Sequence, residues 1–219
     1  MEKLILNSEI IEPKSGNVSK AIILFHGYGG DGKDISVLSN IWSRYLKNTI
    51  FICPDGHEKC EINPNGYQWF DLSKDDPNYI LEQILIAEKK INNFINQIKY
   101  NYHLKNEDIC LSGFSQGCMI SLNVGLTSKE NFNSIIGFSG KIINKEDLSN
   151  RLKNKTNVLL FHGNLDTIVP PNNLLDAKDF LIRHKIRVQS KMIQNCDHTI
   201  PVEASSNALD YLKKNLENN

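Results

Sequence analysis

The sequence has no excess of charge of either sign and no long hydrophobic run. Its 219 residues include 25 Lys and Arg and 25 Asp and Glu, so the formal net charge at pH 7 is zero. This balance provides neither the basic surface of a nucleic-acid-binding protein nor a polybasic membrane anchor. No segment approaches the roughly 18 consecutive apolar residues of a membrane-spanning helix. We therefore expect no nucleic-acid partner and no integral membrane association.

Cysteine is also sparse, and the first residues do not read as a secretion signal. The cysteines are odd in number and scattered, at Cys53, Cys60, Cys110, Cys118 and Cys196. Three of them lie inside or beside apolar runs, where a reduced thiol behaves as a small hydrophobic group. Residues 1–14 have no long apolar core followed by small residues, unlike a signal peptide. These features favour a cytoplasmic protein with reduced thiols.

What the chain does have is a series of short apolar runs. They are rich in β-branched residues and apolar at successive positions, which is typical of strands covered on both faces. The runs are Ala21–Phe25, Thr49–Cys53, Asp108–Ser112, Ser134–Phe138 and Asn157–Phe161. A last strand-like segment follows at Arg187–Ile193, and Lys3–Ile11 is expected to add an edge strand.

Helical patterns alternate with these runs. They predict a long helix opened by Asp76 and Pro77, one after Ser115, one over Asn172–Lys185 and a last one opened by Pro201. The alternation predicts an α/β fold, with a mostly parallel, doubly wound sheet and helices on both faces. Because no linker or repeat interrupts it, we expect residues 1–219 to form a single domain. Ligands of such sheets bind beyond the carboxyl ends of the strands.

One of these ends carries Gly113-Phe114-Ser115-Gln116-Gly117. This is a G-x-S-x-G pattern between a strand and a helix, the context of a nucleophile elbow. The sharp turn exposes the serine hydroxyl, and flanking side chains would collide with neighbouring backbone. The alternative is an ordinary serine N-cap. Ser139, in Phe138-Ser139-Gly140, also follows a strand but lacks the flanking pattern, and we interpret it as a pocket-wall residue.

A nucleophilic serine needs a base and an acid, which follow it in this order: serine, acid, histidine. His198 lies in the loop between the last strand and the last helix, where it can reach the elbow; the alternative is a solvated loop histidine. Asp166 lies just past a core strand and is the predicted acid, which would hold the imidazole in its productive tautomer. Asp197 is the competing acid, and His162, at the end of a strand, is the competing histidine.

The oxyanion donors are expected from two backbone amides. The run Ala21–Phe25 leads into a glycine-rich segment, residues 26–32, that can approach a substrate closely. One donor belongs to this type of loop and the other to the residue after the nucleophile. The prediction is therefore the N–H groups of Tyr28 and Gln116, against the alternative of a plain glycine turn.

With these motifs, nearly the whole chain resembles the phospholipase/carboxylesterase family, which includes the acyl-protein thioesterases. The resemblance rests on His26-Gly27-Tyr28-Gly29, the elbow, Phe138-Ser139-Gly140, His162 to Asp166 with Val169-Pro170, His198-Thr199-Ile200, and Trp69-Phe70-Asp71. It implies a minimal α/β-hydrolase without a separate cap domain that acts on esters, thioesters or lysophospholipids. The implied substrate is a small-molecule or lipid-like acyl ester, and a homodimer is a further expectation.

Three functions remain open on this basis. The first is a serine carboxylesterase working through an acyl-enzyme. The second is an acyl-protein thioesterase or lysophospholipase. The third, from another class, is a non-catalytic acyl-binding protein, against which the complete set Ser115, Asp166 and His198 argues.

The segment Gly56–Asn78 is the longest without a clear strand or helix, and long ordered loops are often functional. It follows a core strand, so it should lie beside the elbow. We expect Trp69 and Phe70 to line a substrate groove; the alternative is that they pin the loop to the core.

Cofactor and metal sites are not expected. Gly27-Tyr28-Gly29 lacks the spacing and the acidic partner of a dinucleotide-binding loop. Cys53, His57 and Cys60 have ligand-type side chains, but a closed zinc site needs four ligands and no fourth is evident nearby.

The first prediction concerns metal removal. Incubation with EDTA should leave esterase activity unchanged, because the expected oxyanion donors are backbone amides. Activity lost in chelator and restored by added zinc would contradict this and return attention to Cys53, His57 and Cys60.

Overall fold

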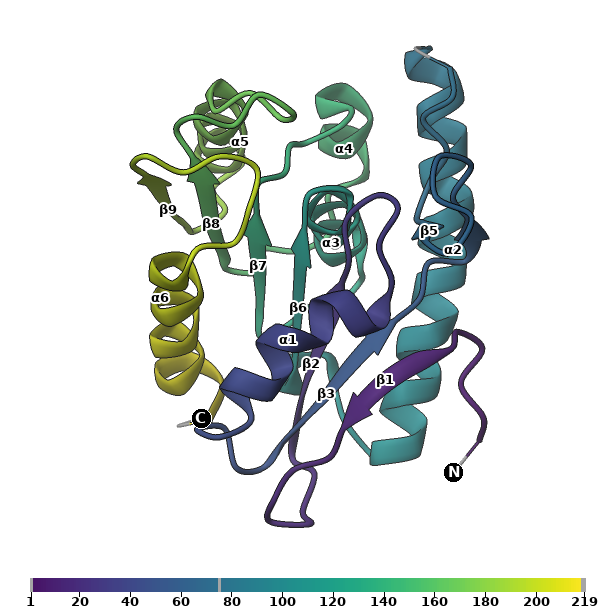
Figure 1. Ribbon diagram of the computed structural model, residues 1–219, viewed down its shortest axis with the longest axis vertical. Coiled ribbons are helices and arrows are strands. Elements are labelled where there is room, and N and C mark those ends of the chain that lie inside the picture. Colours follow the sequence, from purple (N-terminus) through teal and green to yellow (C-terminus); the bar gives the residue numbers. More distant parts are fainter. Residues whose placement is uncertain (1, 75, 218–219) are drawn as a thin grey trace.

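The structure is a computed structural model that describes residues 2–74 and 76–217 (Figure 1). Its main strands are β1 (Ser8–Ile11), β2 (Lys20–Phe25), β3 (Thr49–Pro54), β6 (Ile109–Phe114), β7 (Ser134–Phe138), β8 (Val158–Gly163) and β9 (Val188–Ile193). They form one sheet in the order β1-β3-β2-β6-β7-β8-β9. Only the edge strand β1 is antiparallel to its neighbour, and the other pairs are parallel.

Helices cover both faces of this sheet. They are α1 (Gly32–Trp42), α2 (Pro77–Tyr102), α3 (Gln116–Thr127), α4 (Lys145–Arg151), α5 (Asn172–Arg183) and α6 (Val202–Leu212). The apolar sides of α1 and α6 share one buried cluster. The other face is covered by α2, α3, α4 and α5. The predicted α/β fold class is confirmed. Within the described residues, no helix is both long and apolar enough to cross a membrane.

The predicted elements agree with the structure to within one or two residues, with three exceptions. The edge strand begins at Ser8 rather than Lys3. Helix α1 was not predicted, although Asp31 caps it and Ile35, Leu38 and Trp42 are buried at helical spacing. Helix α4 was not predicted either, because it has seven residues and buries only Leu148. Within Gly56–Asn78, two-residue strands β4 (Glu58–Lys59) and β5 (Tyr67–Gln68) form a small hairpin.

The parallel strands end at a common edge of the sheet, and polar residues follow directly there. His26 follows β2, Ser115 follows β6 and Ser139 follows β7. The register carries this alignment past the strands: Ser115 N–H donates to Phe138 O at 2.8 Å, and Ser139 N–H donates to Phe161 O at 2.8 Å. The sheet itself therefore sets the position of the elbow.

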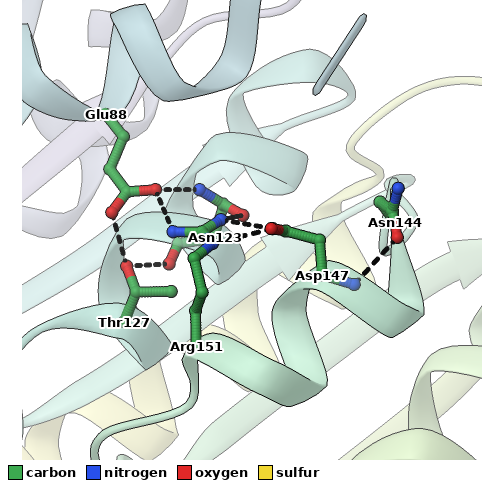
Figure 2. A network of polar contacts seen from close by, with 6 residues as sticks. All are labelled: Glu88, Asn123, Thr127, Asn144, Asp147 and Arg151. Atoms are coloured by element: carbon green, nitrogen blue, oxygen red, sulfur yellow. Dashed lines mark hydrogen bonds and ion pairs between the residues drawn. The ribbon is translucent and has the colours of Figure 1, made fainter. Parts of the chain in front are cut away.

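A polar network joins helices α2, α3 and α4 on one face of the sheet (Figure 2). Arg151 on α4 lies between two carboxylates: its Nη1 is 2.8 Å from Glu88 Oε2 on α2, and its Nη2 is 2.6 Å from Asp147 Oδ2. From α3, Asn123 and Thr127 donate to the two oxygens of Glu88, at 2.6 and 2.9 Å. Each charge is thus paired and hydrogen-bonded, as a partly buried ionic network requires.

The network also fixes the start of α4. Asn144 caps the helix by accepting the N–H of Asp147 at 2.9 Å, and Asp147 is held by Arg151. The segment that enters α4, residues 141–144, therefore has a defined position relative to α2 and α3.

The second prediction tests this network. Arg151→Ala would leave Glu88 and Asp147 without their cation, and we expect the free energy of unfolding to fall by about 1–3 kcal/mol. Urea denaturation monitored by circular dichroism measures it.

Lys145→Ala is the matched control. Lys145 Nζ is 3.0 Å from Asp176 Oδ2, but these side chains are 43% and 53% exposed, against 24% and 15% for Arg151 and Glu88. An ion pair that is so exposed to solvent contributes at most about 1 kcal/mol to stability. Equal effects of the two variants would show that the network contributes no more than a surface pair.

Candidate active site

Ser115 has a strained backbone at the turn between β6 and α3. Its φ is 52° and its ψ is −116°, a conformation that non-glycine residues rarely adopt. The hydrogen bond from its N–H to Phe138 O holds the turn in place. Strain of this kind persists where the surrounding structure imposes it, and it presents the hydroxyl at the edge of the sheet.

The two flanking glycines are required by close backbone approach. A Cβ on Gly113 would lie 2.2 Å from Gly117 O, and a Cβ on Gly117 would lie 2.0 Å from Phe25 O. Both distances are far below van der Waals contact with backbone atoms, which cannot move aside. Only glycine fits at either position, as the sequence pattern predicted.

The structure brings Ser115, His198 and Asp166 into one chain of hydrogen bonds. His198 Nε2 is 2.9 Å from Ser115 Oγ, and His198 Nδ1 is 2.7 Å from Asp166 Oδ2. The other oxygen of Asp166 accepts the N–H groups of Ile168 and Val169 at 3.0 and 2.8 Å. This arrangement can pass a proton from the serine hydroxyl to the imidazole while the carboxylate fixes the imidazole tautomer.

Asp166 is ionised despite its burial. Burial acts to raise its pKa, but the hydrogen bonds from His198 and from the N–H of Val169 outweigh it, so the pKa of this carboxyl is lowered. The carboxylate of Asp166 therefore places a negative charge beside the His198 ring. This charge stabilises the ring when it is protonated.

Neither of the competing residues is hydrogen-bonded to Ser115. His162 is buried beneath Asp166, with its Nε2 2.7 Å from Val169 O and 3.2 Å from Asp166 Oδ2. It faces the carboxylate and has no hydrogen bond to Ser115. Asp197 is exposed. Neither residue joins the chain that ends at Ser115.

Two backbone amides adjoin Ser115 and are free to donate. Within the segment from His26 to Gly30, the N–H of Gly29 donates to Tyr67 O and that of Gly30 to Gly27 O. The N–H of Tyr28 has no acceptor in the described part of the chain. Gln116 is the first residue of α3, so its N–H lies outside the intrahelical ladder. Donors placed in this way can stabilise an oxyanion.

His26 holds the glycine-rich segment in place through two hydrogen bonds of its ring. Its Nδ1 is 2.7 Å from Gly27 O, so this nitrogen must be the donor, and its Nε2 accepts the N–H of Gly56 at 2.9 Å. This pattern requires a neutral ring, and burial lowers the pKa of His26 accordingly. Residues 26–30 are thereby tied to the loop after β3.

Trp69, Phe70 and Ser139, predicted to contact substrate, have almost no exposed surface with which to do so. Trp69 and Phe70 have no exposed surface, and Ser139 is 1% exposed. Trp69 Nε1 donates to His26 O at 2.9 Å, and its N–H donates to the Gln116 side chain at 2.8 Å. That side chain in turn donates to Phe70 O at 2.7 Å. The structure supports the alternative that these aromatic residues pin the loop to the core. Both side chains are fully buried, and the indole of Trp69 and the backbone of both residues are hydrogen-bonded to His26 and Gln116.

Two cavities flank Ser115 instead. The first, of about 390 Å³, is called the acyl cavity here and has a mainly apolar wall that includes Leu72, Ile80, Met119, Ile143 and Ile168, together with Ser115 and Gln116. The second, of about 450 Å³, is called the His198 cavity and is lined by residues 26–28, Gly30, α1, Phe114 and His198. A larger hollow of about 890 Å³ lies at the opposite, amino edge of the sheet among lysines, away from this chemistry.

The cysteine–histidine set does not converge. Cys53 lies on β3 with its thiol 3.2 Å from Ser39 Oγ, whereas Cys60 lies beside Tyr28. Over residues 2–74 and 76–217, no group of three or more His, Cys, Asp or Glu side chains is arranged to hold a metal ion.

Comparison with known proteins agrees with this geometry. The profile of the phospholipase/carboxylesterase family matches residues 6–216. The chain belongs to this family. It is accordingly a serine hydrolase of the α/β-hydrolase fold that acts on carboxylic ester or thioester bonds.

Individual relatives extend over the same length. Acyl-protein thioesterase 1 of Kluyveromyces lactis is 29% identical over 97% of this chain and 99% of the relative. The crystal structure of esterase PE8 superposes with a TM-score of 0.92 at 33% identity, covering 96% of this chain and 99% of that one. Acyl-protein thioesterase 2 of Zea mays, with a TM-score of 0.75 at 22% identity, covers 96% and 99% and shares the fold.

The third prediction separates the two roles considered for Trp69. Trp69→Ala removes a fully buried ring and should lower the free energy of unfolding by about 3–5 kcal/mol. Turnover of acetyl, butyryl and octanoyl esters should fall together, because the ring donates to His26 O and packs against the His26 imidazole rather than contacting the acyl chain. Trp69→Phe keeps a ring but loses the bond to His26 O and should have a smaller effect. A variant with unchanged Tm that loses only octanoyl turnover would show direct acyl contact.

Proposed function

We propose that this chain is a carboxylesterase in which Ser115 is the nucleophile, His198 the general base and Asp166 the residue that orients it. The observation that carries the proposal is the unbroken chain of hydrogen bonds of 2.9 and 2.7 Å at a strained elbow, beside an apolar cavity. An acyl-binding protein without turnover would need neither the strain nor the aligned imidazole.

The reaction proceeds in two steps. Ser115 Oγ attacks the acyl carbon while His198 Nε2 takes the hydroxyl proton, and the N–H groups of Tyr28 and Gln116 hold the oxyanion. The bond to the leaving oxygen breaks as His198 returns the proton to it, leaving an acyl group on Ser115. Water, deprotonated by His198, then attacks the acyl carbon. His198 gives this proton to Ser115 Oγ as the bond between the acyl carbon and Oγ breaks, which releases the carboxylic acid and the free enzyme.

The acyl cavity supports an aliphatic acyl group. Its volume of about 390 Å³ is within the roughly 300–1,000 Å³ typical of small-molecule sites. Its side chains come from the loop after β5, from α2 and α3, and from the segment that enters α4. We infer a medium acyl chain seated against this wall.

A thioester substrate is the second candidate. The relatives favour it, since several of them are named acyl-protein thioesterase 1. The proposed machinery serves both substrates, because oxyanion stabilisation and proton return are common to esters and thioesters. Lysophospholipids remain a third option of the same chemistry. A cytoplasmic location is supported by five buried cysteines with free thiols. Assembly as a homodimer and a single domain over residues 1–219 stay predictions.

The fourth prediction tests the nucleophile. Ser115→Ala should lower kcat on the order of 10⁶-fold and leave the circular dichroism spectrum unchanged. His198→Ala should lose most activity, whereas His162→Gln, which can still donate to Val169 O, should lose less. An esterase activity above about a tenth of wild type in Ser115→Ala would exclude Ser115 as the nucleophile.

The fifth prediction tests the acyl cavity. Ile143→Ala should lower kcat/KM for octanoyl esters more than for acetyl esters, since each buried CH₂ contributes up to about 0.8 kcal/mol. Leu175→Ala is the control, because Leu175 is an exposed leucine of α5 outside both cavities. An equal change for all chain lengths in Ile143→Ala would place the acyl chain elsewhere.

A further inference from the structure

The two cavities differ in which catalytic group they expose. The acyl cavity is lined by Ser115 and Gln116 but not by His198, whereas the His198 cavity is lined by His198 and Phe114 but not by Ser115. In the proposed mechanism, the acyl group stays bonded to Ser115 Oγ, and the leaving atom must come within hydrogen-bond reach of His198 Nε2 to take its proton. The leaving group therefore belongs in the His198 cavity.

Apart from its two histidines, the His198 cavity has one charged side chain, and this is a carboxylate. Asp34, in the first turn of α1, lines it, and the lining includes no Lys or Arg. Asp34 lies against the proposed oxyanion segment, since a Cβ on Gly30 would be 3.3 Å from its Oδ2. By contrast, the acyl cavity has Lys141 in its wall and no carboxylate. The two sides of Ser115 thus differ in the sign of their charge.

The carboxylate of Asp34 is also unused by the fold, unlike its acidic neighbours. Asp31 caps α1 by accepting the N–H of Asp34 at 2.8 Å. Asp55 accepts the N–H of Gly32 at 2.9 Å and the side chain of Asn7 at 2.7 Å. Asp34, which is exposed, forms no ion pair with any residue that the structure describes, and no described donor reaches its carboxylate.

The surroundings of Asp34 are suited to an ammonium group. The same wall includes the aromatic residues Tyr28 and Phe114 and apolar side chains of α1, Ile35 and Leu38. A carboxylate supplies the opposite charge, and aromatic faces attract cations, quaternary ammonium included. A cation on the leaving group would enter a cavity whose lining includes no Lys or Arg to repel it.

We propose that Asp34 is a specificity-determining residue that selects leaving groups bearing a cation, such as alcohols or thiols that carry a quaternary ammonium or protonated amine. This rests on the proposed function of Ser115 and His198. The chemistry of the step is unchanged: the C–O or C–S bond breaks, His198 returns the proton to the leaving atom, and water completes the hydrolysis. Asp34 acts on the bound cation alone and exchanges no proton or electrons.

The test compares two thioesters of equal shape and different charge. Butyrylthiocholine has a trimethylammonium group, and S-(3,3-dimethylbutyl) thiobutyrate has a neutral trimethyl carbon in its place. The ratio of their kcat/KM values, measured by thiol release, should fall roughly three- to fivefold in Asp34→Asn, as for an ion pair open to solvent. The change should appear mainly in KM. In wild type, 0.5 M NaCl should shrink the ratio toward that of the variant, because salt screens exposed charges.

Two further variants complete the design. Asp34→Glu keeps the charge and should retain most of the wild-type ratio. Glu107→Gln makes the same change of net charge in the short helical turn Asn106–Asp108 before β6, at the opposite edge of the sheet, and should leave the ratio unchanged. The Tm of each variant establishes that it is folded.

The outcomes separate the two proposals. A ratio that is unchanged in Asp34→Asn, or that falls equally in Glu107→Gln, would overturn the role of Asp34 while the hydrolase function stands. Hydrolysis of both thioesters that persists in Ser115→Ala would overturn the proposed function. Hydrolysis of neither thioester by wild type would overturn both.

Discussion

The first turn of α3 lies directly against the end of β2, with the backbone of Gly117 closer to the carbonyl oxygens of Phe25 and His26 than any side chain would permit. This approach places the start of α3 beside the glycine-rich segment that follows β2. It brings two chain segments about 90 residues apart in sequence to the same point. The strained turn at Ser115, the amides of Tyr28 and Gln116, and both cavities depend on it. The glycines of the elbow are therefore required for the assembly of the whole site as well as for the turn.

Around that contact, buried polar groups bind three loops into one unit. The side chain of Gln116 both accepts from the backbone of Trp69 and donates to that of Phe70, while the indole of Trp69 donates to His26 O. His26 completes the set by accepting the N–H of Gly56. Because buried polar groups are costly unless paired, each of these bonds restricts the others to one arrangement. The proposed oxyanion donors are thereby held in position before any substrate binds.

At the same edge of the sheet, the two cavities suit different parts of a substrate. An apolar cavity on the Ser115 side, with one wall fixed through α4 and the Arg151 network, suits an acyl chain. A second cavity on the His198 side, with Asp34 and two aromatic residues, suits the leaving group. The proposed proton transfer at His198 connects the two cavities, since in that mechanism the imidazole must face the leaving atom. Specificity for the two halves of a substrate can therefore change independently, through different elements of the fold.

The sequence by itself determined the α/β architecture, the elbow and the order of Ser115, Asp166 and His198, because these follow from short-range rules. Strand and helix periods, the glycines of a tight turn and a histidine after the last strand can each be recognised within about ten residues. The same rules overlooked α4, which is too short and polar for a periodic signal, and α1, which follows directly on a glycine-rich segment.

Only the tertiary structure decided which side chains face a substrate. Trp69 is aromatic and lies in a loop, and nothing local distinguishes a groove wall from an anchor; its hydrogen bond to His26, 43 residues away, makes it an anchor. Asp34 gave no local signal either, and it acquires its proposed role because α1 and the loop of His198 line one cavity. Burial and cavity walls are set by contacts between distant segments. Local patterns therefore identified the residues that we propose as the reacting groups, and long-range contacts set what surrounds them.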